Sequence, residues 1–171
     1  MTNLQEEKKL VLNYFNEIDN CNIESLSEVI SKYTSTDFSM KCTHPFNELV
    51  SADLVANNLW KPIKDSFSPI QRRLDIFYAG INSLDKNKGK WISSMGHFMG
   101  VFNKSFFSLK PNYKSILLRF AEFYKVENNK ITEGAIFLDI MNFMQQLGLS
   151  IIPQSSGLVC VTPGPMNHKG L

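Results

Sequence analysis

Beyond Pro69 the chain changes to an alternation of apolar and polar residues, and this feature restricts its possible folds more than any other. Because successive side chains of a β-strand point to opposite faces, a period of two predicts strands rather than helices. Short polar segments such as residues 127–130 separate the strands, and a longer surface loop is predicted over residues 104–112. Strands that follow one another in this way favour an antiparallel sheet. The predicted strands cover residues 72–82, 90–102, 113–126 and 131–138.

The residues ahead of these strands have the three- and four-residue spacing of amphipathic helices. Asn22 is a candidate N-cap for the second helix, and Ser51 is a candidate N-cap for the third. Helices gathered ahead of an antiparallel sheet predict an α+β domain, in which the helices cover one face of a curved sheet. The predicted helices cover residues 4–18, 23–33 and 51–60, with a short strand over residues 37–44.

Length and charge restrict the organisation of the chain and its partners. With 171 residues the chain is about one domain long, so we expect a domain over residues 1–150 and a Pro/Gly-rich tail or linker over residues 151–171. The net charge is only +2 and no dense cluster of Lys and Arg occurs, which argues against a nucleic-acid partner. No run approaches the roughly 20 apolar residues that a membrane span requires, and the N-terminus lacks an apolar signal. We therefore expect a cytoplasmic protein without membrane contact.

The sequence indicates neither a metal site nor a cofactor site. Cys21, Cys42 and Cys160 form no Cys-x-x-Cys pair, so we expect packing residues in a reducing compartment. The sequence has no His-x-x-x-His pair, no phosphate-binding glycine loop, no dinucleotide fingerprint and no nucleophile elbow. Cofactor-free chemistry or simple binding remains.

The end of the predicted sheet carries the most specific signal. Residues 128–148, NNKITEGAIFLDIMNFMQQLG, resemble the closing motif of the SnoaL-like polyketide cyclases, a branch of the nuclear-transport-factor-2-like superfamily. The motif expects an aromatic residue where this chain has Ala135, and the segments HPFNEL, LWKPI and GHFMGVF are also similar to SnoaL-like segments. The resemblance covers about residues 8–150. The matching motif residues are Lys130, Ile131, Glu133, Asp139, Gln146, Leu147 and Gly148.

The resemblance implies a fold, an assembly and a chemistry. In this family the sheet forms a cone, N-terminal helices pack on its concave face around an apolar ligand cavity, and the protein is usually a homodimer packed through the sheets. An aspartate at the motif position serves as acid and base in an intramolecular aldol closure, without metal or cofactor, and here that role falls on Asp139 alone. The superfamily also includes hydrolases, isomerases and non-enzymes, so the fold does not decide the activity.

Asp139 has two candidate roles, which do not exclude each other. It stands where the last strand becomes a short helix, so its side chain can serve as the N-cap of that helix. It also stands among apolar residues such as Phe137 and Met141, and an apolar cavity raises the pKa of a carboxyl group toward useful basicity. On an uninterrupted strand Ile131, Glu133 and Asp139 would share one face, so Glu133 is also a candidate pocket residue.

Two histidines are further candidates for the catalytic site. His97 stands on a predicted strand beside Gly96 and Gly100, where it could orient the acid, donate to a carbonyl oxygen, or simply be a core histidine. The two glycines share the opposite face of that strand, where the absence of side chains lets another segment pack closely. His44, at the end of the first short strand, is either a residue at the open end of the cone or an ordinary loop histidine.

The remaining candidates are charged or large apolar residues. Arg119 and Glu122 lie at an odd separation on one strand, so only one of them can face the interior. Arg72 and Arg73 precede an apolar strand and are expected at a solvated edge. Large aromatic side chains could line a cavity, but they are more often simple core. The predicted ligand-pocket residues are Trp60, Met99, Glu122, Glu133 and Phe137.

These observations predict a cofactor-independent acid/base enzyme that acts on a small, apolar, carbonyl-containing substrate. Asp139 would be the acid and base, assisted by His97 and His44. The alternative is a module of the same fold that binds a small ligand without converting it, or that serves in dimerisation.

Overall fold

The computed structural model describes residues 4–84 and 89–151. Most of the predicted tail, from residue 152 onward, lies outside the described residues. The helices are α1 (Gln5–Asn20), α2 (Leu26–Tyr33), α3 (Ala52–Val55), α4 (Lys61–Ser66) and α5 (Ile140–Gln146). The strands are β1 (Thr34–Cys42), β2 (Glu48–Val50), β3 (Phe67–Ile81), β4 (Lys90–Phe102), β5 (Ser115–Glu127) and β6 (Lys130–Leu138).

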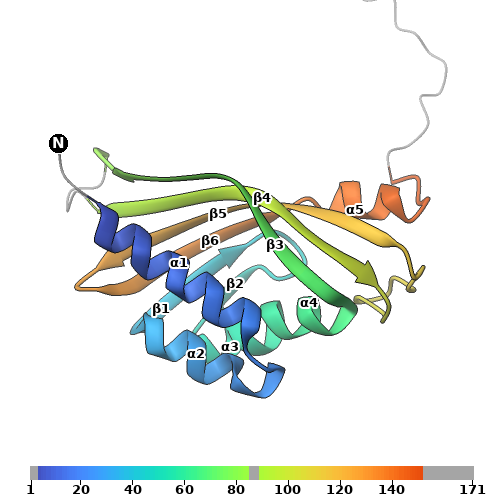
Figure 1. Ribbon diagram of the computed structural model, residues 1–171, viewed down its shortest axis with the longest axis horizontal. Helices are drawn as coiled ribbons and strands as arrows, with labels where there is room; N and C mark the ends of the chain where they lie inside the picture. Colours follow the sequence, from blue (N-terminus) through green and yellow to red (C-terminus); the bar gives the residue numbers. More distant parts are fainter. Residues whose placement is uncertain (1–3, 85–88, 152–171) are drawn as a thin grey trace, which may run out of the picture.

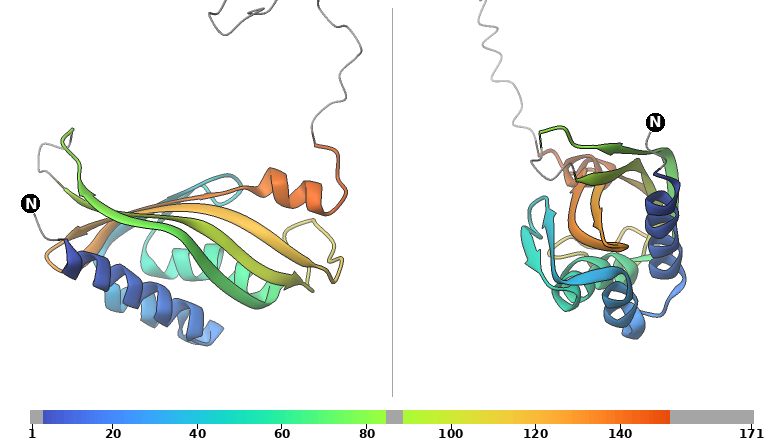
Figure 2. Two further views of the ribbon diagram at one scale, coloured as in Figure 1. Left: turned by 45° about the horizontal axis from the view of Figure 1, so that its top comes forward. Right: turned by 90° about the vertical axis from the view of Figure 1, so that its left-hand side faces the viewer.

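A curved six-stranded sheet organises the described residues, with the strand order β2-β1-β6-β5-β4-β3. Helices α1 to α4 lie against its concave side, whereas α5 extends from the end of β6 beyond the sheet (Figures 1 and 2). The predicted α+β class with a curved sheet is confirmed. Neighbouring strands are antiparallel, except β1 and β6, which are parallel. A parallel pair needs a long crossover connection, and the chain between β1 and β6 is long enough to supply it.

The helical predictions hold with shifts at the ends. Ser51 caps α3 as predicted, because its Oγ accepts a hydrogen bond from the amide of Leu54 at 3.2 Å. The helix predicted there continues through a π-helical segment (Ala56–Trp60) into α4. Asn22 makes no capping bond with its side chain, and it precedes a 3₁₀ turn (Ile23–Ser25) that leads into α2.

The strand predictions differ most where a strand lies at the edge of the sheet. β3 begins at Phe67 rather than at residue 72, and Pro69 lies within it. Proline is tolerated because β3 is an edge strand, where a missing backbone donor need not break a ladder hydrogen bond. Strand β2 was not predicted, because its 3 residues are too few for an alternation to be recognised.

Two glycines of β4 allow the close approach that the sequence predicts, and the approaching segment is β3. A Cβ atom added at Gly96 would overlap the carbonyl oxygen of Arg73, and one added at Gly100 would lie 2.9 Å from the carbonyl oxygen of Pro69. Because no side chain stands at either position, the backbone of β3 can bend toward β4. The path of β3 in turn decides which of its side chains point inward.

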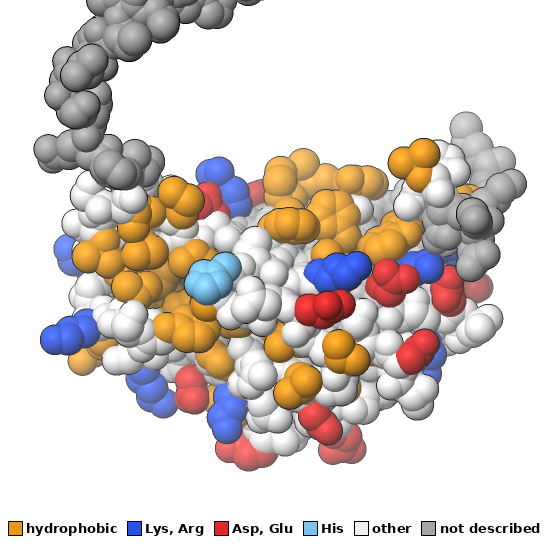
Figure 3. Space-filling model, turned by 180° about the vertical axis from the view of Figure 1, so that it is seen from behind, with side chains coloured by type: hydrophobic (Ala, Val, Ile, Leu, Met, Phe, Trp, Pro, Cys, Tyr) orange, Lys and Arg blue, Asp and Glu red, His pale blue; other side chains and the backbone are white. Residues whose placement is uncertain are grey.

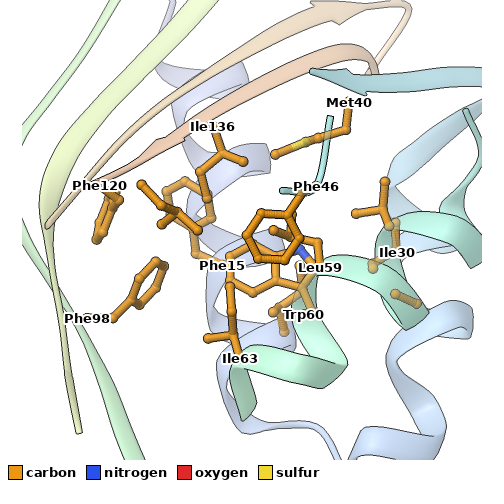
Figure 4. Packing of buried hydrophobic residues seen from close by; sticks show 14 of the residues in the cluster. Phe15, Ile30, Met40, Phe46, Leu59, Trp60, Ile63, Phe98, Phe120 and Ile136 are labelled. Atoms are coloured by element: carbon orange, nitrogen blue, oxygen red, sulfur yellow. The ribbon is translucent and has the colours of Figure 1, made fainter. Parts of the chain in front are cut away.

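The core lies between the concave face of the sheet and the helices, and aromatic side chains dominate it. Trp60, Phe98 and Phe120 point into the interior from a helical segment, β4 and β5 (Figure 4). The ring centroids of Trp60 and Phe98 are 5.8 Å apart, and those of Phe98 and Phe120 are 4.4 Å apart, distances at which aromatic pairs attract beyond simple burial. A second aromatic cluster holds α5 to the sheet and contains Phe67, Phe102, Phe106 and Phe143.

Candidate functional site

A buried ion pair stands in the interior of the cone, where α1 faces the central strands. Nη1 of Arg72, on β3, donates to Oε2 of Glu122, on β5, at 2.6 Å. The side chain of Arg72 is 4% exposed and that of Glu122 is 0% exposed, so water screens this pair very little. Ser94 of β4 donates to the same carboxylate oxygen at 3.3 Å. Asp19, near the end of α1, accepts from Nε and Nη2 of Arg72 at 2.9 and 3.3 Å.

The prediction that Arg72 lies at a solvated edge is wrong. Its guanidinium carbon lies 4.1 Å from the ring centroid of Phe15 and 4.8 Å from that of Phe98, and both rings attract a cation at such distances. The physical reason is Glu122, because a buried carboxylate makes the interior a favourable place for one arginine. Arg73, the next residue, is exposed as expected.

Burial and neighbouring charges together determine the ionisation of this cluster. Burial raises the pKa of Glu122, and the guanidinium of Arg72 opposes that rise. Burial acts to lower the pKa of Arg72, but the carboxylates of Glu122 and Asp19 outweigh it, so the pKa of Arg72 is raised. Burial also raises the pKa of the Tyr14 and Tyr124 phenols, which therefore remain protonated donors near neutral pH.

Several polar atoms around this pair have no hydrogen-bond partner among the described residues. They are Oε1 of Glu122, the hydroxyl oxygens of Tyr14 and Tyr124, and the indole nitrogen of Trp60. The two tyrosine rings are in contact, with centroids 5.6 Å apart. Because buried polar groups are nearly always paired, a group of unpaired atoms beside a buried ion pair marks the interior as a candidate site.

A narrow opening leads toward this cluster from the surface, between the end of α1, helix α4 and β3. Its volume is about 10 Å³, which is near the lower limit for a single water molecule. At this opening the interior is occupied by side chains, which leave room for little more than one water molecule. Trp60 and Phe98 are among the residues that line the opening, and they would have to move to admit a ligand.

Asp139 caps α5, so its predicted capping role is confirmed. Its Oδ1 accepts a hydrogen bond from the amide of Asn142 at 2.9 Å. The pairing of β6 with β5 shifts register at Lys125, which interrupts the alternation along β6. Ile131 is consequently buried, whereas Asp139 lies on the outer side of the sheet, beside a shallow hollow of about 210 Å³. Its catalytic role stays a prediction.

The two predicted catalytic histidines do not meet Asp139 in the interior. His97 lies on the outer side of β4, with Nδ1 3.0 Å from Oδ2 of Asp75. Arg119 of β5 stands in register with His97, and its carbonyl oxygen accepts from the amide of Asp139 at 2.9 Å. His97, Arg119 and Asp139 thus form a row across the outer face of the sheet. His44 is exposed in the loop after β1, next to Thr43, whose Oγ1 accepts a hydrogen bond from the amide of Leu138 at 3.2 Å.

The predicted pocket residues are divided between the two faces of the sheet. Trp60 and Glu122 lie in the interior, and both contact Arg72. Met99 and Phe137 lie on the outer side, where Phe137 is 53% exposed. Glu133 is also on the outer side, and it accepts a hydrogen bond from the lysine of the neighbouring strand at 3.1 Å.

Sequence reasoning missed three members of the interior cluster: Arg72, Tyr14 and Asp19. No short pattern identifies Arg72, because the run Ile, Gln, Arg, Arg over residues 70–73 shows no alternation, although the structure leaves residues 70 and 72 partly buried and residues 71 and 73 exposed. For Tyr14 the helical spacing predicted burial but carried no information on its neighbours. The position of Asp19 depends on the partner that α1 meets, which no local pattern specifies.

The other motif residues have structural partners in this chain. Oε1 of Gln146 accepts from the amide of Leu117 at 3.0 Å, and its Nε2 donates to the carbonyl oxygen of the same residue at 2.8 Å. Lys130 donates to the carbonyl oxygen of Lys32, near the end of α2, at 2.6 Å. Gly148 has a φ of 80°, the left-handed conformation that commonly ends a helix. The motif therefore closes the sheet and starts α5.

We expect Gln146→Ala to lower the free energy of unfolding by about 1 kcal/mol, because it removes the paired hydrogen bonds that attach α5 to β5. Urea unfolding followed by circular dichroism measures the change. Gln145→Ala is the matched control, since Gln145 is an exposed residue of the same helix. Equal stability of the two variants would contradict the role given to Gln146.

Residues 4–84 and 89–151 contain neither a metal-binding cluster nor a helix that could cross a membrane. No group of three or more His, Cys, Asp or Glu side chains is placed to hold a metal ion there. No helix in those ranges has the combined length and apolar character that a membrane crossing needs. Cys21 and Cys42 are free thiols, and Cys160 lies outside the described residues.

Solved structures with a similar fold identify the architecture of this chain. No protein-family model matches the sequence, and no curated protein matches it. Among solved structures, AclR, a candidate hydroxylase from Streptomyces galilaeus, superposes with a TM-score of 0.68 at 18% identity over 89% of this chain and 87% of its own. A candidate SnoaL-like polyketide cyclase from Jannaschia sp. CCS1 has a TM-score of 0.65 at 11% identity over 85% and 94%.

A third structure names the wider superfamily: a nuclear-transport-factor-2-like protein from Burkholderia thailandensis has a TM-score of 0.60 at 15% identity, over 82% of this chain and 95% of its own. Identities this low establish the fold and leave the reaction open. The fold implied by the closing motif is thereby confirmed. The chain has the nuclear-transport-factor-2-like cone fold that SnoaL-like polyketide cyclases share.

Proposed function

We propose that the protein is a cofactor-independent acid/base enzyme for a small, largely apolar carbonyl compound, and that Glu122 is its acid and base. The state of the Glu122 carboxyl group carries this proposal. Arg72 and Ser94 hold one of its oxygens, and the other oxygen is buried without a partner among the described residues. A carboxyl group held through one oxygen presents the other in a fixed position. Burial raises the pKa of Glu122 and thereby its basicity.

The neighbours of Glu122 supply the second requirement of such a reaction. Removal of a proton beside a carbonyl group leaves an enolate oxygen, which preorganised donors in a dry site stabilise. Tyr14 and Tyr124 each bring to this region a buried hydroxyl donor without a partner among the described residues, and the Trp60 indole lies close enough to Tyr14 to oppose the rise in the pKa of its phenol. The shared fold with proteins named as polyketide cyclases supports the same class of chemistry, at the level of the fold alone.

Hydrogen exchange followed by NMR tests this proposal without knowledge of the natural substrate. In D₂O we expect the protein to accelerate exchange of the acidic C–H protons of apolar 1,3-dicarbonyl compounds. Glu122→Gln should slow the catalysed exchange by about 100-fold, the lower end of what a general base contributes. Unchanged exchange in a folded Glu122→Gln variant would contradict the proposal.

The site predicted from the sequence provides the comparison set for this experiment. Asn caps a helix as well as Asp does, so Asp139→Asn should leave α5 intact. If Glu122 is the acid and base, three variants should catalyse the exchange of the dicarbonyl proton at close to the wild-type rate. They are Asp139→Asn, His97→Gln and His44→Gln. A large loss in Asp139→Asn alone would assign the chemistry to the outer row instead.

We also propose that the outer face of the sheet binds a second copy of the chain. Met95 is 41% exposed and Phe137 is 53% exposed on this face, although both are large apolar residues. Figure 3 shows hydrophobic side chains gathered in patches on one side of the molecule. The same face carries exposed Arg119 beside Asp139 in the shallow hollow, and Asp75 beside His97, so two copies related by a two-fold axis can pair opposite charges.

Light scattering of the full chain checks this assembly. We expect a dimer mass for the wild type and a monomer mass for Phe137→Lys, because the new charge would be buried at the interface. Leu54→Lys is the matched control, since Leu54 is a 43% exposed apolar residue on the helical side. A wild-type monomer, or a dimer that Phe137→Lys leaves intact, would count against the outer face as the interface.

A further inference from the structure

We infer that the substrate of the interior site carries a carboxylate group, and that this group replaces the side chain of Asp19 on Arg72. The inference rests on the proposed function and adds a substrate class to it. Asp19 binds the Nε and Nη2 side of the guanidinium at 2.9 and 3.3 Å, which is the two-bond geometry in which arginine binds carboxylates generally. A ligand carboxylate can therefore take the same position while Arg72 stays in place.

The two partners of this pair are unequally fixed. The side chain of Asp19 is 32% exposed, whereas that of Arg72 is 4% exposed among aromatic rings. Asp19 is also the penultimate residue of α1, where the negative end of the helix dipole disfavours a carboxylate. The Asp19 carboxylate can therefore rotate into water, whereas the buried guanidinium of Arg72 stays in place.

Asp19 stands where a ligand would have to enter. It lines the narrow opening together with apolar residues that include Ile63, Ile70 and Phe98. Rotation of its side chain would widen the opening, so the apolar part of a ligand would meet apolar walls. Glu122 binds the opposite side of the same guanidinium, so a carboxylate on Arg72 would hold the ligand next to the proposed acid and base.

The backbone around Asp19 is held independently of its carboxylate. Lys64 donates to the carbonyl oxygens of Ile18, Asp19 and Cys21 at 2.7, 3.2 and 2.8 Å. These bonds keep the end of α1 in place, so the exchange requires rotation of the Asp19 side chain and movement of Trp60 and Phe98, which line the opening. The Lys64 ammonium group also adds a positive charge at the opening, which attracts anions.

The exchange preserves the charge of the buried cluster, because one carboxylate replaces another on Arg72. The usual obstacle to binding an ion in a protein interior is the loss of its hydration without a full replacement. Here the buried guanidinium of Arg72 supplies the ligand carboxylate with two hydrogen bonds and with the opposite charge. An uncharged ligand of the same shape would leave Arg72 with unpaired donors once Asp19 is displaced.

Benzoate and benzamide are suitable probes, because they are similar in size and shape and differ in charge. In calorimetric titrations of the full chain, we expect Asp19→Ala to bind benzoate about tenfold more tightly than the wild type, since the competing side chain is gone. Benzamide should bind more weakly than benzoate to both proteins. Asp65→Ala is the control, because it removes a different partly exposed acid, the partner of Lys104, and should behave as the wild type.

Arg72→Lys in the Asp19→Ala background provides a second arm, because lysine keeps the charge but cannot form the two parallel bonds. We expect it to weaken benzoate binding strongly. If that variant does not fold, the comparison of benzoate with benzamide in Asp19→Ala decides by itself. Equal affinities for the two probes, or no benzoate binding to Asp19→Ala, would overturn the inference. A different result would contradict the proposed function: exchange of neutral dicarbonyl compounds that Glu122→Gln leaves unchanged.

Discussion

Arg72→Met is expected to lower the free energy of unfolding by about 3–5 kcal/mol, the usual cost of removing one partner of a buried ion pair. Glu122, which is 0% exposed, would keep its burial and lose its guanidinium. Methionine is long and flexible enough to pack against Phe15 and Phe98, so the loss reports mainly on charge. Urea unfolding monitored by circular dichroism measures it.

The destabilisation in Arg72→Met should increase with pH. Burial raises the pKa of Glu122 above its unfolded value, so the stability that its protonation contributes is present at low pH and is lost as pH rises through the native pKa. Without Arg72 the native pKa of Glu122 rises further, and this loss continues to higher pH. The stability difference between wild type and variant should therefore be larger at pH 8 than at pH 5.

Two controls separate charge from other effects. Arg73→Met changes an exposed residue of the same strand and should alter the free energy of unfolding by no more than about 0.5 kcal/mol. Arg72→Met combined with Glu122→Leu should recover much of the loss, because apolar residues can replace a buried pair. A double variant as unstable as Arg72→Met would show that the unpaired carboxylate is not the cause.

Gly96→Ala is expected to cost about 3 kcal/mol, at the upper end of the range for overpacking. A methyl group there would overlap the backbone carbonyl of Arg73, and a backbone cannot rotate away as a side chain can. The β3 backbone would have to move, and Arg72 would move with it. Urea unfolding gives the stability change.

Gly80→Ala is the matched control for this substitution. Gly80 also lies in a long strand of the sheet, but an added methyl group would meet no atom within 4 Å. We expect its stability to equal that of the wild type or to exceed it slightly, because alanine reduces the freedom of the unfolded chain. Similar losses for both glycine variants would mean that the approach of β3 to Gly96 is not the reason.

The parts of the fold that could be predicted are those with local causes. Alternation identified the long strands, and short side-chain bonds explain why Ser51 and Asp139 could be identified as helix caps. The odd separation of Arg119 and Glu122 predicted that only one of them faces the interior, and the structure shows that it is Glu122. The parallel partner of β1 and the early start of β3 depend on contacts between distant segments, which no short pattern encodes.

The candidate site could be predicted only in part, because its members come from separate strands and a helix. Glu122 and Trp60 were identified as pocket residues, but the cation between them was not. Arg72 reaches them across β4, which separates β3 from β5 in the sheet. The outer position of Asp139 depends on the register shift near Lys125, and a shift by one residue reverses the facing of a strand.

The parallel pairing of β1 with β6 has a consequence for how the chain folds. Met40 pairs with Gly134, so β1, which is synthesised early, can pair with β6 only after nearly all of the described chain has been made. Contacts between such distant segments slow folding, because the loop between them must first be closed. A nascent chain that ends before β6 would expose the edges of β1 and β5 together, and such edges invite aggregation. We expect a chaperone that shields strand edges to raise the yield of this protein during synthesis.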